Sequence, residues 1–155
     1  MADLLSHVLV AYSLGTILSW RYKDIKKHHI TFLMIGAALP DLTRIALIID
    51  PGRVGWITFN FFPLHTVIGV GITATILSTM VKDDLALPFL FSGALTHLFL
   101  DSLLINVTGH SYPMFWPVTA YAPPTPGLYL STDVGTAMIA GAAAILVWTF
   151  HRKKL

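Results

Sequence analysis

The sequence predicts an all-α membrane protein, a bundle of about five transmembrane helices that forms one integral-membrane domain over residues 1–155. Only 12% of the residues are charged, whereas an average soluble domain has about 25%. The mean hydropathy is +0.71. The apolar residues also gather in long stretches between short polar breaks. These observations exclude an ordinary soluble protein and leave no room for a separate soluble domain.

Five stretches supply the predicted spans, since a helix needs about 20 apolar residues to cross a bilayer. They cover residues 4–20, 30–49, 61–81, 85–107 and 133–150. The first follows Met1-Ala2-Asp3, which lacks the positive region of a secretory signal, and is expected to be retained. The breaks are residues 21–29, 50–60, 82–84 and the longer segment 108–132.

Lysine and arginine set the expected orientation, because cytoplasmic loops carry the excess of positive charge. One side of the five-span topology holds Arg21, Lys23, Lys26, Lys27, Lys82, Arg152, Lys153 and Lys154. Only Arg53 falls clearly on the other side, and Arg44 lies within the second span. We therefore expect a multi-pass protein of the cell membrane, with its N-terminus outside and its C-terminus in the cytoplasm. The same rule explains the net charge of +2 without a nucleic-acid partner.

Small residues are concentrated in two of the spans and indicate close helix packing. They are Gly69 and Gly71 in the third span, and Gly135, Ala137, Ala140, Gly141, Ala142, Ala143 and Ala144 in the last. Such faces are suited to contacts within the bundle, and also to a homo- or hetero-oligomer.

Five titratable residues lie inside the apolar spans, in the half that the topology places outside. They are His7, Asp41, His65, His97 and Asp101. An ionised Asp at the bilayer centre costs about 2.5–3.5 kcal/mol, so each needs a partner, a proton or a water-filled cavity. The chain has no Glu, Gln or Cys. Metal binding and acid–base chemistry therefore fall to Asp and His.

The i, i+4 spacing of His97 and Asp101 places both side chains on one helix face. Nitrogen and carboxylate ligands of this kind suit a divalent metal, most simply zinc. Each residue also has a simpler interpretation: a His97–Asp101 hydrogen bond, an ion pair between Asp41 and Arg44, an interfacial His65, or a hydrogen-bonded core His7. One metal cavity explains all five positions together, and is the hypothesis that we carry forward.

The remaining histidines are weaker candidates. His110 lies on the outer side and is ranked below the five as an extra ligand or acid. His28, His29 and His151 lie among the basic residues and are expected to be solvated. Segment 108–132 is rich in proline and aromatic residues and has no Lys, Arg, Asp or Glu. It is expected on the outer surface, as a lid over the cavity or as a simple connector.

Several motifs, taken in order, resemble the LexA-regulated membrane-bound metal-dependent hydrolase family. They are His7, Leu39-Pro40-Asp41-Leu42, His65-Thr66, Thr96-His97 through Asp101-Ser102-Leu103, Gly109 and Phe115-Trp116-Pro117. The family is distantly similar to zinc-dependent phospholipase C, and the resemblance implies the same five residues as metal ligands. The chain departs from the pattern at Thr43, where a second acidic residue is usual, at residues 59–62, which lack the usual His-Arg pair, and in the order His65-Thr66.

The predicted function is that of a membrane-embedded, metal-dependent hydrolase acting on a phosphoester, naturally that of a lipid, at the outer leaflet. Metal-bound water would be the nucleophile and either Asp41 or Asp101 the general base. The alternative is a non-catalytic accessory or structural subunit of a membrane complex that keeps a vestigial metal site. A transporter could use the same residues as a proton or metal relay. Its polar path would have to continue through the cytoplasmic half, where the sequence offers none.

Overall fold

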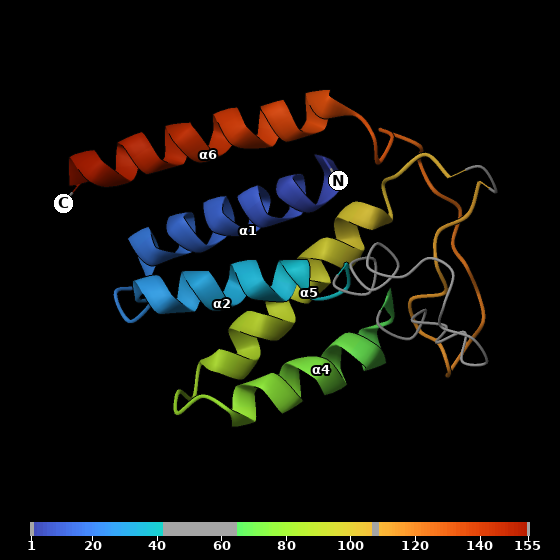
Figure 1. The fold of residues 1–155 in the computed structure, drawn as a ribbon, viewed down its shortest axis with the longest axis horizontal. Helices are drawn as coiled ribbons and strands as arrows, with labels where there is room; N and C mark the ends of the chain where they lie inside the picture. The colour runs from blue at the N-terminus through green and yellow to red at the C-terminus, as the bar shows by residue number, and fades with distance from the viewer. Residues whose placement is uncertain (1, 42–64, 107–108, 155) are drawn as a thin grey trace, which may run out of the picture.

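The computed structural model describes residues 2–41, 65–106 and 109–154, and this part of the chain is helical (Figure 1). The all-α class is therefore confirmed for the described residues, which form five helices and no β-strand. These helices are α1 (Ala2–Arg21), α2 (Lys27–Ala38), α4 (Val67–Thr79), α5 (Ala86–Asp101) and α6 (Val134–Lys154).

One of the described helices is long and apolar enough to cross a membrane on the criteria of length and composition. The stretch that qualifies is Val134–Lys153 of α6. Helices α4 and α5 are apolar but shorter. Helix length and composition thus support one candidate span, and do not by themselves support the predicted five.

Helix α2 ends at Ala38, although the apolar pattern predicts a helix through residue 49. Pro40 has no N–H to donate to the carbonyl one turn earlier, so the regular hydrogen-bond ladder stops there. The Asp41 N–H instead donates to the Ala38 carbonyl in a turn. The rest of the predicted span, with Thr43 and Arg44, lies outside the described residues, as does Arg53.

Two other predicted spans are also longer than the observed helices. Helix α4 begins at Val67 because the Thr66 hydroxyl caps it by accepting a hydrogen bond from the Gly69 N–H at 3.0 Å. Helix α5 ends at Asp101, and the chain beyond it pairs with the segment before α6. The Ile105 N–H donates to the Tyr129 carbonyl, and the Leu128 N–H donates to the Leu103 carbonyl.

The helices run back and forth between two ends of the bundle (Figure 1). The start of α1, the end of α2, the start of α4, the end of α5 and the start of α6 share one end, which we call the cluster end. The opposite end, called the basic end, holds the α1–α2 and α4–α5 connections and the end of α6. Within the bundle α1 packs on α2 and α6, and α5 packs on α2 and α4.

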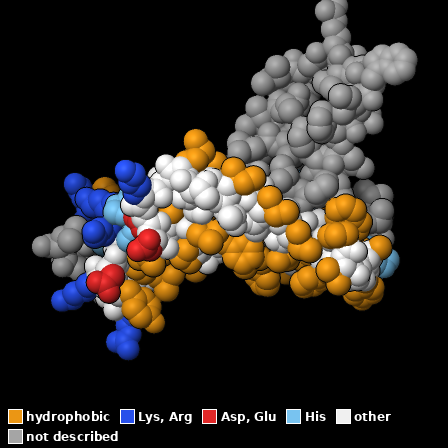
Figure 2. Space-filling model, turned by 90° about the horizontal axis from the view of Figure 1, so that it is seen from below, with side chains coloured by type: hydrophobic (Ala, Val, Ile, Leu, Met, Phe, Trp, Pro, Cys, Tyr) orange, Lys and Arg blue, Asp and Glu red, His pale blue; other side chains and the backbone are white. Residues whose placement is uncertain are grey.

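Alanine and polar side chains occupy much of the interior, together with the larger apolar residues Ile30, Leu33, Leu39, Val70, Leu90, Leu98 and Leu104, whereas many other large apolar side chains lie on the outside. Buried residues include Ala11, Ala37, Ala74, Ala94, His7, Thr16 and His97, and exposed ones include Ile72, Ile76, Phe99, Met138, Ile139 and Ile145. Figure 2 shows hydrophobic side chains along the described surface, with Lys and Arg gathered at one end. Soluble domains seldom expose so many large apolar side chains, so the outer helix faces are suited to an apolar environment.

Helices α2 and α5 cross through two facing glycines. A Cβ on Gly36 would collide with the Leu90 carbonyl, and a Cβ on Gly93 would collide with the Leu33 carbonyl. Both obstacles are backbone, which cannot rotate away as a side chain can. The absence of two Cβ atoms therefore allows the two backbones to touch at the crossing.

We predict that Gly93→Ala destabilises the fold. A helical Gly→Ala change gains up to about 1 kcal/mol of helix propensity, whereas overpacking a tight contact costs about 1–3 kcal/mol, and here the clash is with backbone. The measurement is the thermal unfolding midpoint of detergent-solubilised protein. Gly141→Ala is the matched control, since its Cβ would lie 3.9 Å from the Leu9 side chain. A Gly93→Ala midpoint at or above that of wild type would contradict the close crossing.

Candidate metal centre

Four segments bring all five sequence-predicted residues together at the cluster end. His7 lies early in α1, Asp41 follows α2, His65 precedes α4, and His97 and Asp101 lie near the end of α5. They form two overlapping groups, His7–His97–Asp101 and Asp41–His65–His97. In each group the candidate ligand atoms lie within 4.8 Å of one another. The structure therefore contains His and Asp groups that could hold a metal ion.

Asp101 is the common neighbour of the three histidines. Its Oδ1 lies 3.2 Å from His7 Nε2, and its Oδ2 lies 3.3 Å from His97 Nε2 and 3.9 Å from His65 Nε2. Asp41 Oδ1 lies 3.9 Å from His65 Nε2. The His7 and His97 rings stack with centroids 4.0 Å apart. All five residues are buried, and His7 and His97 have no exposed surface.

The tautomer of His97 follows from a backbone contact. His97 Nδ1 lies 2.7 Å from the carbonyl oxygen of Ala37. A carbonyl can only accept, so Nδ1 carries a proton and donates it. In the neutral ring Nε2 then holds a lone pair, which is the arrangement of a metal-binding histidine oriented by a carbonyl.

This lone pair lies next to carboxylate oxygen. His97 Nε2 and both Asp101 oxygens are buried and make no hydrogen bond within the described part of the chain, in spite of their short separations. Two acceptor atoms 3.3 Å apart in a buried site repel each other unless a cation or a proton lies near both. The donor set of imidazole nitrogens and carboxylate oxygens fits a borderline dication.

The simpler interpretations of the single residues fare differently. His97 and Asp101 do approach each other on α5, but their contact lacks hydrogen-bond geometry. His65 is 8% exposed, so it is part of the buried cluster rather than an interfacial side chain. The alternative of an Asp41–Arg44 ion pair involves Arg44, which lies outside the described residues. His110 is exposed and belongs to neither group.

Part of segment 108–132 covers the cluster end. The Val67 N–H donates to the Met114 carbonyl at 2.8 Å, and the Tyr129 hydroxyl donates to the Leu100 carbonyl at 2.8 Å. The Tyr112 ring lies 5.3 Å from the His65 ring. These contacts connect the segment to the elements that carry His65 and Asp101.

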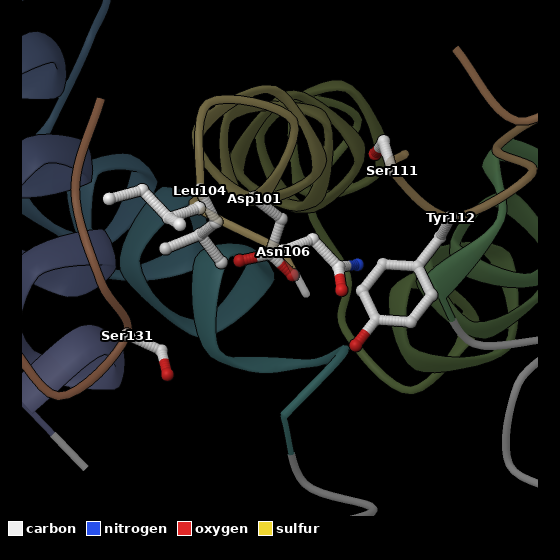
Figure 3. Close-up of a pocket in the computed structure, with 7 residues that line it drawn as sticks. Asp101, Leu104, Asn106, Ser111, Tyr112 and Ser131 are labelled. Carbon is white, nitrogen blue, oxygen red and sulfur yellow. The ribbon is translucent and has the colours of Figure 1, made fainter. Parts of the chain in front are cut away.

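A cavity of about 160 Å³ lies between this segment and the end of α5. It is lined by Asp101, Leu104, Ile105, Asn106, Ser111, Tyr112 and Ser131. Figure 3 shows the side chains of Asp101, Asn106 and Tyr112 directed toward one another in it. Asp101 thus belongs to the cluster and also lines a small polar cavity.

Sequence reasoning missed two contributors to this site. The Ala37 carbonyl orients His97, but a backbone acceptor has no signature in the side-chain pattern. Gly36 and Gly93 bring α2 and α5 close enough for this hydrogen bond. In the sequence, the close crossing of the two helices is indicated only by Gly36 and Gly93, each within an apolar stretch.

A second His/Asp group lies at the basic end. His28 Nε2 and His29 Nε2 lie 2.8 and 3.1 Å from Asp83 Oδ2. The Lys26 N–H donates to His29 Nδ1 at 3.0 Å, so this nitrogen holds the lone pair and the neutral ring carries its proton on Nε2. His29 therefore donates to Asp83 and connects α2 to the α4–α5 turn. Both ring nitrogens of His29 are therefore engaged in hydrogen bonds, and neither is left to bind a metal ion.

All three histidines expected to be solvated, His28, His29 and His151, are in fact hydrogen-bonded. The expectation is wrong for His29, which is 3% exposed and stacks on the Phe89 ring. His151 accepts a hydrogen bond on Nδ1 from the Trp20 indole at 2.9 Å. His28 is half exposed and pairs with Asp83. Sequence proximity to lysines did not reveal these partners, which come from distant segments.

Comparisons with protein families, curated proteins and solved structures find no match to this chain.

We predict that the His28–His29–Asp83 group stabilises the fold in a pH-dependent way. The pKa of Asp83 is lowered below its ordinary value of 3.8. The largest cause is the hydrogen bond from the Leu85 N–H, and the hydrogen bonds from His29 and His28 add to it. A lowered pKa means that folding favours the carboxylate, so its contribution is present above pH 3.8 and is lost as the pH falls through the folded value.

Asp83→Asn should therefore lower the unfolding midpoint at neutral pH, and the difference from wild type should shrink under acid conditions. Asp84→Asn, a neighbouring exposed carboxylate, is the control. Equal midpoints for Asp83→Asn and wild type at neutral pH would refute the stabilising role.

Proposed function

We propose that this protein is a membrane-embedded, metal-dependent hydrolase that acts on a phosphoester at the outer leaflet. The observation that carries the proposal is the His97 lone pair, fixed by the Ala37 carbonyl, beside the buried Asp101 carboxylate. The resemblance to membrane-bound metal-dependent hydrolases, carried by motifs that include these five residues, favours the same chemistry.

The placement of side chains supports a membrane-embedded bundle with more than one crossing. Large apolar side chains are exposed on α4, α5 and α6, where only lipid or another apolar surface would shield them. The basic end holds Arg21, Lys23, Lys82 and Arg152, and the cluster end lies opposite (Figures 1 and 2). With the basic end in the cytoplasm, the cluster lies toward the outer leaflet.

The tautomer of His97 favours one ion rather than two. His97 belongs to both candidate groups, but its Nδ1 is engaged with Ala37 and leaves a single ligand atom. Two ions cannot both use that atom, so the groups are alternatives or parts of one shell. We propose zinc as the ion, since it accepts His and Asp ligands in the absence of cysteine. Four-coordinate zinc with an open position takes three protein ligands, which leaves the other members of the cluster to orient them.

A bound zinc would supply a water of lowered pKa and a positive charge toward phosphate. The side chains supply the rest. Whichever of Asp41 and Asp101 does not hold the ion would be placed to act as the general base. His7 is completely buried against His97 and Asp101, and so holds them in place and excludes bulk water.

The cavity beside Asp101 suggests where a substrate would bind. It has room for a phosphate-sized group, about 160 Å³, but not for acyl chains. Asn106, Ser111, Tyr112 and Ser131 offer polar atoms around it. A lipid phosphoester would thus place its headgroup in the cavity and keep its chains in the bilayer.

We predict metal-dependent phosphoesterase activity from the purified protein in nanodiscs. Zinc content is measured first, followed by hydrolysis of a chromogenic phosphodiester and a panel of lipid phosphoesters. A chelator should abolish turnover, and Asp41→Asn should lower it by about 10²-fold or more, because it removes either a ligand or a general base. His110→Ala, an exposed histidine outside the cluster, should keep both metal and activity.

Two results would overturn parts of this proposal. Protein that retains zinc but hydrolyses no phosphoester would favour the non-catalytic accessory subunit. Protein that binds no zinc, copper or manganese would contradict the metal centre itself.

A further inference from the structure

A second site lies on the other side of the bundle, where α1, α2 and α6 meet. Two adjoining cavities of about 420 and 550 Å³ lie between these helices. Tyr12, Met34 and Trp148 line both of them, so they form one groove. We propose that this groove binds an anionic phospholipid of the inner leaflet. The proposal rests on the membrane placement proposed above but not on the hydrolase chemistry.

The end of the groove nearer the basic end carries positive charge and hydrogen-bond donors. It is lined by Tyr12, Thr16, Lys27, Ile30, Thr31, Met34, Trp148, His151 and Arg152. Among these described lining residues there is no carboxylate. The Arg152 guanidinium lies over the Trp148 ring, 4.8 Å from its centroid, and is thereby held against the groove. Lys27 approaches from α2, so cations flank the groove from two helices.

Two uncharged groups lie in the same place. His151 Nδ1 accepts from the Trp20 indole, so the neutral ring carries its proton on Nε2 and offers a donor. The Thr16 hydroxyl is buried, with 1% of the residue exposed, and has no hydrogen-bond partner among the described residues. A buried hydroxyl in this state costs free energy unless a ligand or water meets it. Phosphate oxygens would accept from His151 Nε2, whereas the buried Thr16 hydroxyl lies behind the groove surface.

The other end of the groove is apolar. It is lined by Leu9, Tyr12, Met34, Gly141, Ala144, Ile145 and Trp148. No charged residue is among them. Gly141 and Ala144 on α6 leave the space open, and among the described residues a Cβ on Gly141 would meet only Leu9, at 3.9 Å. An acyl chain matches this part in shape and polarity.

The cationic end and the apolar end of the groove together indicate which kind of molecule binds there. A free anion would use the cationic part alone, and an apolar peptide would leave Lys27 and Arg152 without a counter-charge. A phospholipid has both parts in the right order, with its headgroup at the basic end and its chain toward the bilayer centre. Basic pockets between helices on the cytoplasmic side are the sites at which anionic lipid headgroups bind.

The test measures which lipids stay bound to the full chain. The protein is reconstituted in nanodiscs of phosphatidylcholine containing a minor fraction of phosphatidylglycerol. It is then transferred to mild detergent, and the retained lipids are measured by native mass spectrometry. Wild type should retain phosphatidylglycerol several-fold above its share of the nanodisc. The double variant Lys27→Gln/Arg152→Gln should lose this enrichment, and Gly141→Leu, which fills the apolar end, should lower total lipid retention.

Matched controls separate the groove from general charge or bulk. Lys23→Gln/Lys153→Gln removes two exposed cations that do not line the groove, and Ala143→Leu adds the same side chain at an exposed site on α6. Both should behave like wild type. The proposed metal centre lies at the opposite end of the bundle, so zinc content and activity should not change in any groove variant. The lipid measurement can therefore be interpreted even if the hydrolase proposal fails.

Three outcomes would overturn the lipid site. One is equal enrichment in wild type and Lys27→Gln/Arg152→Gln. Another is displacement of the anionic ligand by inorganic phosphate with no effect of Gly141→Leu, which would indicate a free-anion site. The third is a dimer in the native spectra that Gly141→Leu dissociates, which would mean that a second copy of the chain fills the groove.

Discussion

The hydrogen bond from His97 to the Ala37 carbonyl is the interaction on which the cluster depends. It joins α5 to α2 at 2.7 Å and fixes which imidazole nitrogen is left for chemistry. It forms at the end of α2, where a helix leaves carbonyls without an intrahelical donor. Pro40 creates that end, and Gly36 with Gly93 brings the two helices together. Fold and site therefore rest on the same few residues.

The five-residue cluster and the His28–His29–Asp83 group illustrate why residue type alone does not define a metal site. Both contain histidines within reach of an aspartate, and in both the candidate ligand atoms of each group of three lie within 4.8 Å of one another. At the cluster end His97 Nδ1 donates to a backbone carbonyl, so the lone pair on Nε2 lies next to Asp101. At the basic end a backbone N–H occupies the lone pair of His29, so the ring donates to Asp83. The first arrangement leaves two acceptors facing each other, which a metal ion or a proton would stabilise, whereas in the second each acceptor already faces a donor.

The sequence predicted the helical class and the meeting of five distant residues. Alternating span directions place His7, Asp41, His65, His97 and Asp101 at one end, and costly polar residues in apolar stretches indicated that they matter. Whether five helices cross a membrane remains a proposal, because helix length and composition support one span.

Helix ends and local partners could not be predicted as well. Apolar runs continue past Ala38 and Asp101, but Pro40 and the backbone pairing of Ile105 with Tyr129 stop the helices there. The burial of His29 depends on Asp83 in a distant turn. Such partners arise from tertiary packing, which overrides the local pattern on which sequence reasoning relies.

The most direct test of the metal centre is the zinc X-ray absorption spectrum of the purified, zinc-loaded protein. The account predicts a first shell of nitrogen and oxygen with the outer-shell scattering of imidazole. This scattering should weaken in His97→Ala and be unchanged in His29→Ala. A spectrum altered by His29→Ala but not by His97→Ala would place the ion at the basic end, and would contradict the assignment of the cluster as the metal centre.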